Sequence, residues 1–473
     1  MLIWGKRQVG FVLGILPLLL SWLLPPPVHL PVMAYHVGAI AVLMVVWWVC
    51  EVVPLTMTGC IPLVLFPFYG IASIDRVAES YANPILFLII SGLFIGLAIQ
   101  RTQLHERMVF LLLRTLGSSL RLHIAGLMLV TAFLSMWVSN TVTAIIMLPI
   151  ALALIDVHQQ EPQDCSLPML LSLMYAANIG GMGTLIGTPP NAFVAGFLQQ
   201  DYGITVSFLQ WSELALPIVC VLLMAVWVWL CVIKFKVSKA SSERVSDWVI
   251  QRARQMGAVS HDELYILLIL VMTALAWMLR PWLGSVFHTQ LISDTGIAMS
   301  ASIVLFLVPS QLRQGDYLMN WDVAKKIPWG VLLLMGGGFA LAAEINASGL
   351  GLWMAGYLQV LSYVPVIIQL AVTTLCILFL TEVNSNTATT ITFVPLLALL
   401  AINVGVPPEL LVFPAAFCAS CAFMLPVATP TNAVIYSSGL IKLDDMLRLG
   451  IKVNLIAWGI IVLMSYVLIP RLF

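Results

Sequence analysis

Long apolar segments recur from one end of the chain to the other and limit its possible folds more than any other feature. Their length fits the hydrocarbon core of a bilayer, which an α-helix of about 20 residues crosses. Lipid offers no hydrogen bonds to an open backbone, so runs of this length indicate helices rather than barrel strands. The sequence therefore predicts an all-α polytopic membrane protein, with apolar segments at 9–24, 36–53, 55–70, 81–100, 124–156, 166–198, 211–233, 262–283, 291–308, 328–347, 364–403, 409–437 and 451–470.

The composition agrees with a chain that lies mostly in lipid. Hydrophobic residues make up 61% and charged residues 9%, with a mean hydropathy of +1.04, whereas soluble domains carry about 25% charged residues. The formal net charge is zero, which singles out no partner, and we expect contact with the lipid bilayer and no nucleic acid. Cys418 and Cys421 form a CxxC pair within an apolar segment, without a second pair nearby, so we expect packing rather than metal or redox chemistry.

Two apolar segments, 124–156 and 364–403, are longer than one span and carry Ser-Asn-Thr in the middle. A helix interrupted halfway by polar residues is typical of a re-entrant hairpin whose tip lies near the membrane midplane. The segment 9–24 follows Lys6 and Arg7 but no cleavage site follows it, so we interpret it as a retained span. We therefore expect about eleven transmembrane spans and two re-entrant hairpins.

Lysine and arginine positions orient these spans. With the N-terminus inside, all but Arg76, Arg280 and Arg471 of the 21 basic residues fall in inside segments, as the positive-inside rule requires. Counting either hairpin as a full crossing would spoil this bias. We expect a multi-pass protein of the plasma (inner) membrane, with a cytoplasmic N-terminus and the C-terminus outside. The charged segment 234–261 would be a cytoplasmic linker whose basic residues set the topology.

Three sequence elements occur twice in the same order. Their offsets of 245, 246 and 241 residues are nearly constant, which indicates a duplicated unit. The first hairpin follows the arginine-rich stretch 101–121, and the second follows 348–363, which has no Lys or Arg. The hairpins thus enter from opposite sides, and inverted repeats of this kind are typical of secondary transporters. The matching pairs are 91–98 with 336–343, 135–154 with 381–400, and 187–191 with 428–432.

The paired motifs supply oxygen atoms and amide donors to the middle of the membrane. Isolated Ser and Thr often serve as polar contacts between helices, but two Ser-Asn-Thr copies at matching positions favour a ligand site. The segments GTPPN (187–191) and ATPTN (428–432) should unwind their helices, because proline frees a carbonyl one turn back. Such carbonyls suit a hard cation like sodium, and amides at helix N-termini suit a carboxylate. A simple proline kink is the alternative.

Charged side chains are sparse around these motifs. Neither hairpin nor either proline-rich segment contains Lys or Arg, so a bound anion would need dipoles and co-bound cations. Glu382 adjoins the second motif, and its counterpart Met136 is apolar; we interpret Glu382 as a residue at the mouth of the site rather than a proton-coupling group. We interpret Glu51, which ends the second span, as an interfacial cap or packing contact.

These paired motifs, together with WWVCEVVPLTMTGCIPLVLFPF at 47–68, resemble the divalent anion–sodium symporter (DASS, INDY-type) family over nearly the whole chain. The resemblance implies a homodimeric scaffold and an elevator mechanism in which a transport domain carries the substrate across. It divides the chain into a scaffold part and a transport part of each repeat around the cytoplasmic linker: 1–120 and 262–363 for the scaffold, 121–233 and 364–473 for transport, and 234–261 for the linker.

The resemblance also implies roles for single residues. Substrate carboxylates would contact Asn140, Thr141, Asn386, Thr387 and Pro430. The two sodium ions would be co-transported, the first on Ser135, Ser139, Asn140 and Gly187, and the second on Thr381, Ser385, Asn386 and Ala428. The chain departs from internal symmetry at Val142, which stands opposite Ala388 and would narrow the pocket.

We therefore expect sodium-coupled transport of C4-dicarboxylates such as succinate, malate or fumarate. Citrate or sulfate symport and sodium-independent dicarboxylate exchange remain alternatives, because such transporters share these motifs. An intramembrane enzyme is disfavoured, since HExxH is absent and Asp444-Asp445 has no second acidic cluster. A channel is disfavoured by the broken helices of the inverted repeats.

Overall fold

The computed structural model describes residues 2–116, 119–158, 165–237, 243–286, 292–313, 315–358 and 364–473. Within these ranges the chain folds into α-helices joined by turns, with a π-helical segment at Val228–Lys234 and no multi-residue strand. Nine of the described helices are long and apolar enough to cross a membrane. The prediction of an all-α polytopic membrane protein is confirmed.

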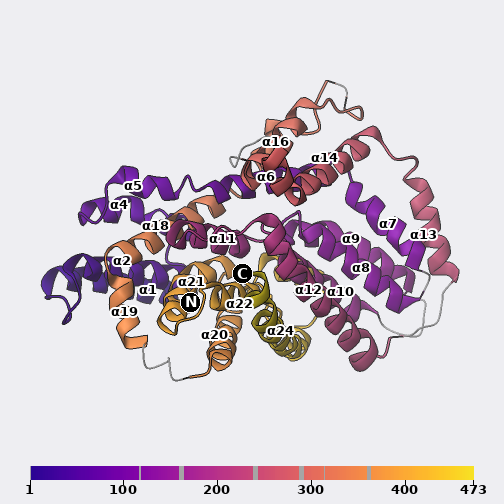
Figure 1. The fold of residues 1–473 in the computed structure, drawn as a ribbon. Coiled ribbons are helices and arrows are strands. Elements are labelled where there is room, and N and C mark those ends of the chain that lie inside the picture. The colour runs from indigo at the N-terminus through magenta and orange to yellow at the C-terminus, as the bar shows by residue number, and fades with distance from the viewer. Residues whose placement is uncertain are drawn as a thin grey trace.

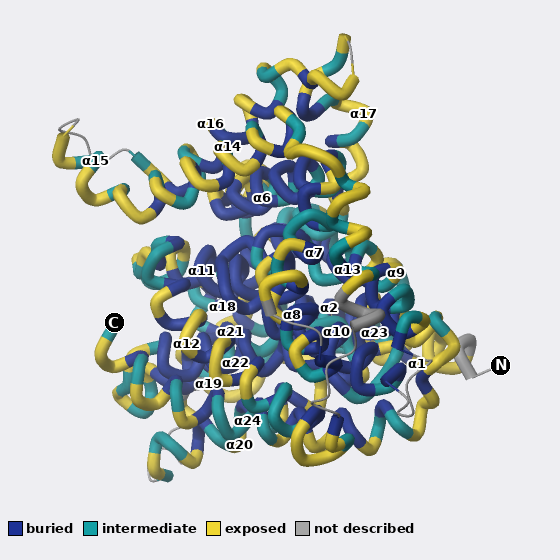
Figure 2. Tube along the Cα trace, turned by 90° about the vertical axis from the view of Figure 1, so that its right-hand side faces the viewer, coloured by how far each residue is buried: buried dark blue, intermediate teal, exposed yellow. Residues whose placement is uncertain are grey.

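The helices lie in four neighbouring groups, which can be followed in Figure 1. The first lies at the left of that view and comprises α1 (Leu2–Leu23), α2 (Val32–Cys50), α3 (Leu55–Thr58), α4 (Ile61–Phe68), α5 (Ile74–Ser80), α18 (Gly330–Ala347) and α19 (Leu350–Leu358). The second forms a layer at the top of Figures 1 and 2 and comprises α6 (Pro84–Arg101), α14 (His261–Met278), α15 (Arg280–Val286), α16 (Asp294–Leu307) and α17 (Trp321–Ala324).

The other two groups carry the paired motifs. The third lies at the right of Figure 1 and comprises α7 (Leu104–Leu116), α8 (Leu120–Ser135), α9 (Asn140–His158) and α13 (Glu243–Gln255). The fourth occupies the centre and lower part and comprises α10 (Ser166–Gly181), α11 (Pro189–Tyr202), α12 (Phe208–Trp227), α20 (Val366–Leu380), α21 (Asn386–Asn403), α22 (Glu409–Ala419), α23 (Pro430–Tyr436) and α24 (Leu443–Leu472). The third group contacts the fourth extensively where α8 packs on α10.

Local sequence signals set where several of these helices begin. Ser207 and Ser260 open α12 and α14 with capping boxes, in which each serine and the residue three positions later satisfy two free N–H groups. Asn83 caps α6 and Thr429 caps α23, and in both helices proline occupies the first position, where its missing N–H costs nothing. Glu51 ends α2 in the left-handed conformation with its N–H on the Trp47 carbonyl, which agrees with the cap interpretation.

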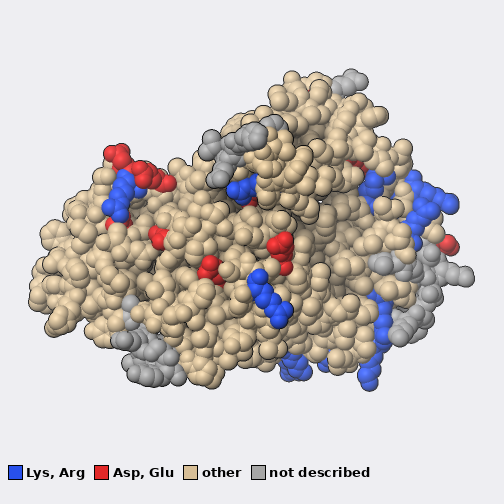
Figure 3. All heavy atoms as spheres, in the orientation of Figure 1, with Lys and Arg blue, Asp and Glu red and all other residues tan. Residues whose placement is uncertain are grey.

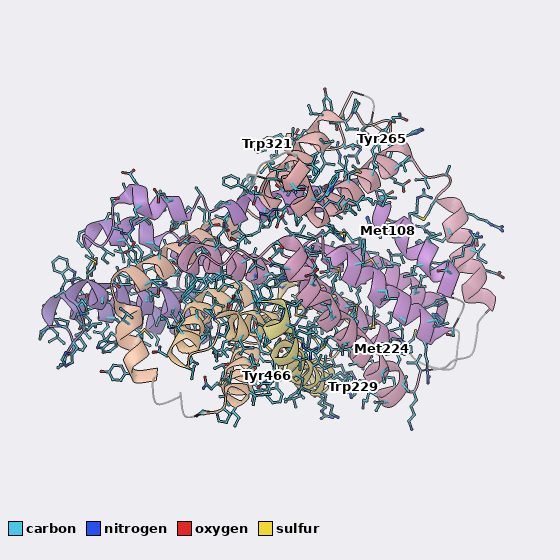
Figure 4. All side chains as sticks on the ribbon, viewed as in Figure 1. Met108, Met224, Trp229, Tyr265, Trp321 and Tyr466 are labelled. Carbon is cyan, nitrogen blue, oxygen red and sulfur yellow. The ribbon has the colours of Figure 1, made fainter. Side chains whose placement is uncertain are left out.

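Burial separates a polar-containing centre from an apolar outside. Buried residues concentrate in the middle of the fold, around α10 and α11 (Figure 2), and nearly every residue of α10 is buried. Most of the face drawn in Figure 3 carries neither acidic nor basic side chains. Met224 and Tyr466, labelled near the lower edge of Figure 4, are 62% and 43% exposed. Exposed apolar side chains on the long helices suit contact with lipid tails.

Four apolar segments of the sequence are each divided into two helices. The segment 124–156 is interrupted between α8 and α9, and 364–403 is interrupted between α20 and α21. The segments 166–198 and 409–437 are interrupted between α10 and α11 and between α22 and α23, where unwinding was expected. The predicted linker 234–261 is described only in part, and 238–242 lie outside the described residues.

Candidate functional site

The two Ser-Asn-Thr motifs each begin a helix beside a broken helix of the other repeat. Asn140 is the first residue of α9, and Asn386 is the first residue of α21. Helix α9 packs against α23, and helix α21 packs against α11. Because α11 and α23 are the matching elements of the two repeats, this arrangement is itself symmetric. It brings both motifs to the interface between the repeats. The same interface receives the first break, which is the segment 182–188 between α10 and α11, and the second break, which is the segment 420–429 between α22 and α23.

A buried hydroxyl precedes each motif and makes the same pair of contacts. Ser135 Oγ lies 2.7 Å from Asn140 Oδ1 and 2.6 Å from the Ala177 carbonyl oxygen. Thr381 Oγ1 lies 2.7 Å from both Asn386 Oδ1 and the Ala419 carbonyl oxygen. One hydroxyl has one proton and can donate to only one of its two oxygen neighbours. Each cluster therefore holds more oxygen lone pairs than protons, which suits a hard cation.

Two glycines allow the first break to approach this cluster. A Cβ on Gly187 would lie 2.4 Å from the Gly181 carbonyl oxygen and 3.0 Å from the Ser135 carbonyl oxygen. A Cβ on Gly181 would lie 2.3 Å from Asn140 Oδ1. Side chains at either position would occupy the space in which these oxygens meet. The structure thus brings together Ser135, Asn140 and Gly187, three of the four residues predicted to bind the first ion.

The remaining predicted residues lie at the starts of α9, α21 and α23 or in the segment between α22 and α23. Ser139 Oγ accepts a 3.4 Å hydrogen bond from the Val142 backbone at the start of α9. Ser385 is the residue before α21, and Ala428 lies in the second break, where its N–H donates to the Leu425 carbonyl at 3.2 Å. The motif residues Asn140, Thr141, Ser385 and Asn386 are half-buried, Thr387 is buried, and Pro430, at the start of α23, is exposed.

The asparagine that ends each proline-rich motif donates hydrogen bonds to backbone carbonyls of the interrupted helix. Asn191 Nδ2 donates to the carbonyls of Gly181 at 2.9 Å and Thr184 at 2.7 Å. Asn432 Nδ2 donates to Ala422 at 2.8 Å and Leu425 at 2.9 Å. These amides pair carbonyls that the interrupted helices leave free. The sequence indicated ligand binding by the motifs that contain both asparagines, but it did not predict that these amides hold the interrupted backbone.

The interpretation of Glu382 as a mouth residue is wrong. Its side chain is 3% exposed and accepts hydrogen bonds from the backbone of the second break and from Asn454. Oε1 accepts from Asn454 Nδ2 at 2.6 Å and from the Phe423 N–H at 2.7 Å, while Oε2 accepts from the Leu425 N–H at 3.1 Å. Consecutive free N–H groups form a natural anion site, and this carboxylate fills it. The apolar counterpart Met136 hid this function in the sequence.

The electrostatics of the interface come from dipoles rather than from basic side chains. The sequence has no Lys or Arg in 122–233 or in 327–441, which include both motifs and both breaks. Free N–H groups at the starts of α9 and α21 provide partial positive charge instead. The arrangement can hold small cations in the oxygen clusters and present amides and hydroxyls to an anion beside them.

Sequence comparison relates nearly the whole chain to known transporters. The family described as "Sodium:sulfate symporter transmembrane region" matches residues 6–472. The sodium-dependent dicarboxylate transporter SdcS of Staphylococcus saprophyticus subsp. saprophyticus is 37% identical over 98% of this chain and 92% of its own length. The protein of the same name from Staphylococcus aureus (strain USA300) is 38% identical over 98% of this chain and 91% of its own length.

Structure comparison finds the same fold in transporters of low sequence identity. The YdaH transporter of Alcanivorax borkumensis superposes with a TM-score of 0.62 at 16% identity, covering 91% of this chain and 98% of its own. MtrF of Neisseria gonorrhoeae superposes with a TM-score of 0.62 at 13% identity, covering 97% of this chain and 94% of its own. Matches at this identity establish a shared fold and carry no statement about substrate.

Proposed function

Because the chain belongs to the sodium:sulfate symporter transmembrane family, we propose that it couples sodium to the transport of C4-dicarboxylates such as succinate, malate or fumarate. The proposal rests chiefly on the two matching oxygen clusters, Ser135 with Asn140 and Thr381 with Asn386. The sodium-dependent dicarboxylate transporters that the chain resembles support the choice of ion and substrate class. The relatives are transporters, and the chain is not an enzyme.

The sodium ions would bind in the oxygen clusters. The first would use Ser135, Ser139, Asn140 and Gly187, and the second Thr381, Ser385, Asn386 and Ala428. A bound cation would stabilise each cluster, because it accepts electron density from the oxygen lone pairs that the single hydroxyl proton cannot satisfy. Each buried hydroxyl would then donate its proton to the Ala177 or Ala419 carbonyl and present a lone pair to the ion.

The dicarboxylate would lie between the two motifs. Asn140 and Thr141 would contact one carboxylate, Asn386 and Thr387 the other, and the exposed Pro430 would form part of the pocket wall. Desolvating a dianion is costly unless charge compensates it. Since the segments that carry the motifs contain no Lys or Arg, the co-bound sodium ions and the N-termini of α9 and α21 would supply that compensation. Substrate and sodium therefore stabilise each other, which is the thermodynamic basis of symport.

Movement across the membrane would follow an elevator scheme in a homodimer, with the two interrupted helix pairs as re-entrant hairpins and eleven spans. Aromatic contacts join the predicted transport and scaffold parts. The Trp277 ring lies 3.9 Å from Phe208 and 6.1 Å from Trp137, with interplanar angles of 19° and 12°. The Phe208 N–H also donates to Asp294 Oδ2 at 2.7 Å, so the movement would have to break this hydrogen bond as well as the ring contacts. In the inner membrane, the N-terminus would be cytoplasmic and the C-terminus outside.

Uptake into proteoliposomes tests the proposal directly. Labelled succinate should accumulate when sodium is high outside, and should not accumulate when the same potassium concentration replaces it. Unlabelled malate and fumarate should compete, whereas citrate and sulfate should compete weakly if the pocket accepts C4-dicarboxylates. Uptake that ignores sodium but requires internal dicarboxylate would refute symport and establish exchange. Strong competition by citrate or sulfate, without competition by malate or fumarate, would refute C4-dicarboxylates as the substrate class.

A further inference from the structure

Three asparagine side chains form a row between the first oxygen cluster and the second break. Asn140 Nδ2 donates to Asn178 Oδ1 at 3.4 Å, and Asn178 Nδ2 donates to Asn432 Oδ1 at 3.1 Å. Asn178 lies in α10, and both Asn178 and Asn432 are fully buried. The row therefore runs from the half-buried Asn140 in the first repeat through buried side chains to the second repeat.

The row has a single direction. Each Oδ1 atom accepts and each Nδ2 atom donates, from the Ser135 hydroxyl through Asn140 and Asn178 to Asn432. Asn432 Nδ2 then donates to the Leu425 carbonyl, which also accepts from the N–H of Ala428. Hydrogen bonds aligned in this way polarise one another, so a change at one end is felt at the other.

The repeat symmetry does not produce a second row. Asn178 follows Ala177, and the matching residue after Ala419 is Ser420, whose hydroxyl donates to Ala416 in its own helix at 3.2 Å. Asn191, the counterpart of Asn432, has a buried Oδ1 without a hydrogen-bond partner among the described residues. Only one of the two possible links is therefore made, and it runs from the first cluster to the second break.

Resting on the proposed function, we propose that Asn178 is a positioning residue that makes the two sodium sites cooperative. A cation on Asn140 Oδ1 draws electron density from that amide and makes its Nδ2 a stronger donor to Asn178. The 3.4 Å contact is longer than the usual range of about 2.7–3.2 Å, so it can shorten when the ion binds. The strengthened row then fixes Asn432 against the carbonyls of the break that contains Ala428.

Sodium titration separates this coupling from a purely structural need for a buried amide. The variant Asn178→Ser cannot span the gap between Asn140 and Asn432, and serine is the residue at the matching position. The control Ser420→Ala removes a buried hydroxyl next to the second cluster without touching the row. Succinate uptake and the melting temperature of the purified protein are each measured against sodium concentration, so that the Hill coefficient is obtained from two readouts.

For the melting temperature measured without substrate, the expected result is a sodium Hill coefficient near two in the wild type and in Ser420→Ala, and near one in Asn178→Ser. The sodium concentration for half-maximal uptake should rise roughly fivefold in Asn178→Ser, the lower end of typical coupling between sites. A wild-type coefficient of one, or an unchanged coefficient in Asn178→Ser, overturns the coupling and leaves symport intact. Uptake by the wild type without any sodium dependence overturns the proposed function itself.

A second measurement keeps the proposal testable if Asn178→Ser does not fold. Hydrogen–deuterium exchange reports how sodium protects the backbone of 420–428 in the wild type and in Ser135→Ala, which disables the first cluster but retains Asn178. If the row couples the sites, Ser135→Ala should require more sodium to protect this segment. Equal protection curves for the two proteins would refute the coupling.

Discussion

Replacing Thr381 by valine removes one hydroxyl from the second cluster and keeps the side-chain shape. The Thr381 Oγ1 atom lies 2.7 Å from both Asn386 Oδ1 and the Ala419 carbonyl oxygen, and the residue is fully buried. Loss of one hydrogen-bonding group at a buried site costs about 1–3 kcal/mol. If that group also binds sodium, its loss should raise the sodium concentration for half-maximal succinate uptake roughly 5- to 150-fold.

A matched control comes from the same helix. Thr374 is also fully buried in α20, but its hydroxyl donates to the Leu370 carbonyl one turn back. Thr374→Val therefore removes an equally buried hydroxyl away from the cluster and should leave the sodium dependence unchanged. Thr381→Ser restores the hydroxyl that Ser135 supplies in the first repeat, and should recover most of the sodium affinity. Wild-type sodium dependence in Thr381→Val would refute the assignment of this oxygen to the ion.

Three further perturbations have defined outcomes. Gly181→Ala should abolish uptake, because the added Cβ would lie 2.3 Å from an amide oxygen of the first motif. The control Gly459→Ala, whose Cβ would meet no atom within 4 Å, should transport normally. Equal uptake by the two variants would contradict the close packing. Glu382→Gln should lower the stability of the purified protein by about 3 kcal/mol in a denaturation assay, since a charged acceptor of several hydrogen bonds is lost; an unchanged stability would contradict its role in the break. The pKa of Asp316, in the loop after α16, is held below its ordinary value chiefly by the Tyr317 N–H. A lowered folded-state pKa adds stability that is complete above the unfolded value and is lost as the pH falls through the folded one. The melting temperature of the wild type should therefore fall as the pH drops below about 4, and that of Asp316→Asn should fall less. Parallel profiles would contradict this.

The sequence predicted those parts of the site that occur in both repeats. The near-constant offset between the repeats pointed to 139–141 and 385–387, and the family resemblance added Ser135 and Thr381, whose hydroxyls make nearly identical contacts. The proline-rich motifs pointed to the breaks because proline cannot donate to the helix ladder. Each of these motifs lies within a short segment, so the sequence alone was sufficient to predict these parts of the site.

Residues without a counterpart escaped the same reasoning. Glu382 matches Met136, and Asn178 matches Ser420, so comparison of the repeats gave neither residue any weight. Their partners lie far along the chain, since Glu382 holds the backbone of 423–425 and Asn178 reaches Asn432. Such contacts depend on how the helices pack, which hydrophobic periodicity does not encode. The division into scaffold and transport parts at 120, 233 and 363 stays a prediction for the same reason.

The crossed packing of the repeats has a consequence for biosynthesis. Helices α9 and α11 are made early, but their partners α23 and α21 leave the ribosome roughly 200 residues later or more. Until then the surfaces of α9 and α11 that later contact these helices face lipid or the insertion machinery, although Ser135 and Asn191 have their hydrogen-bond partners within the first half. The first half therefore cannot reach its final state alone, and a truncated chain should be recognised as incomplete and degraded. The crossed contacts that bring the two motifs to one interface therefore also make the folding of the first half depend on the second.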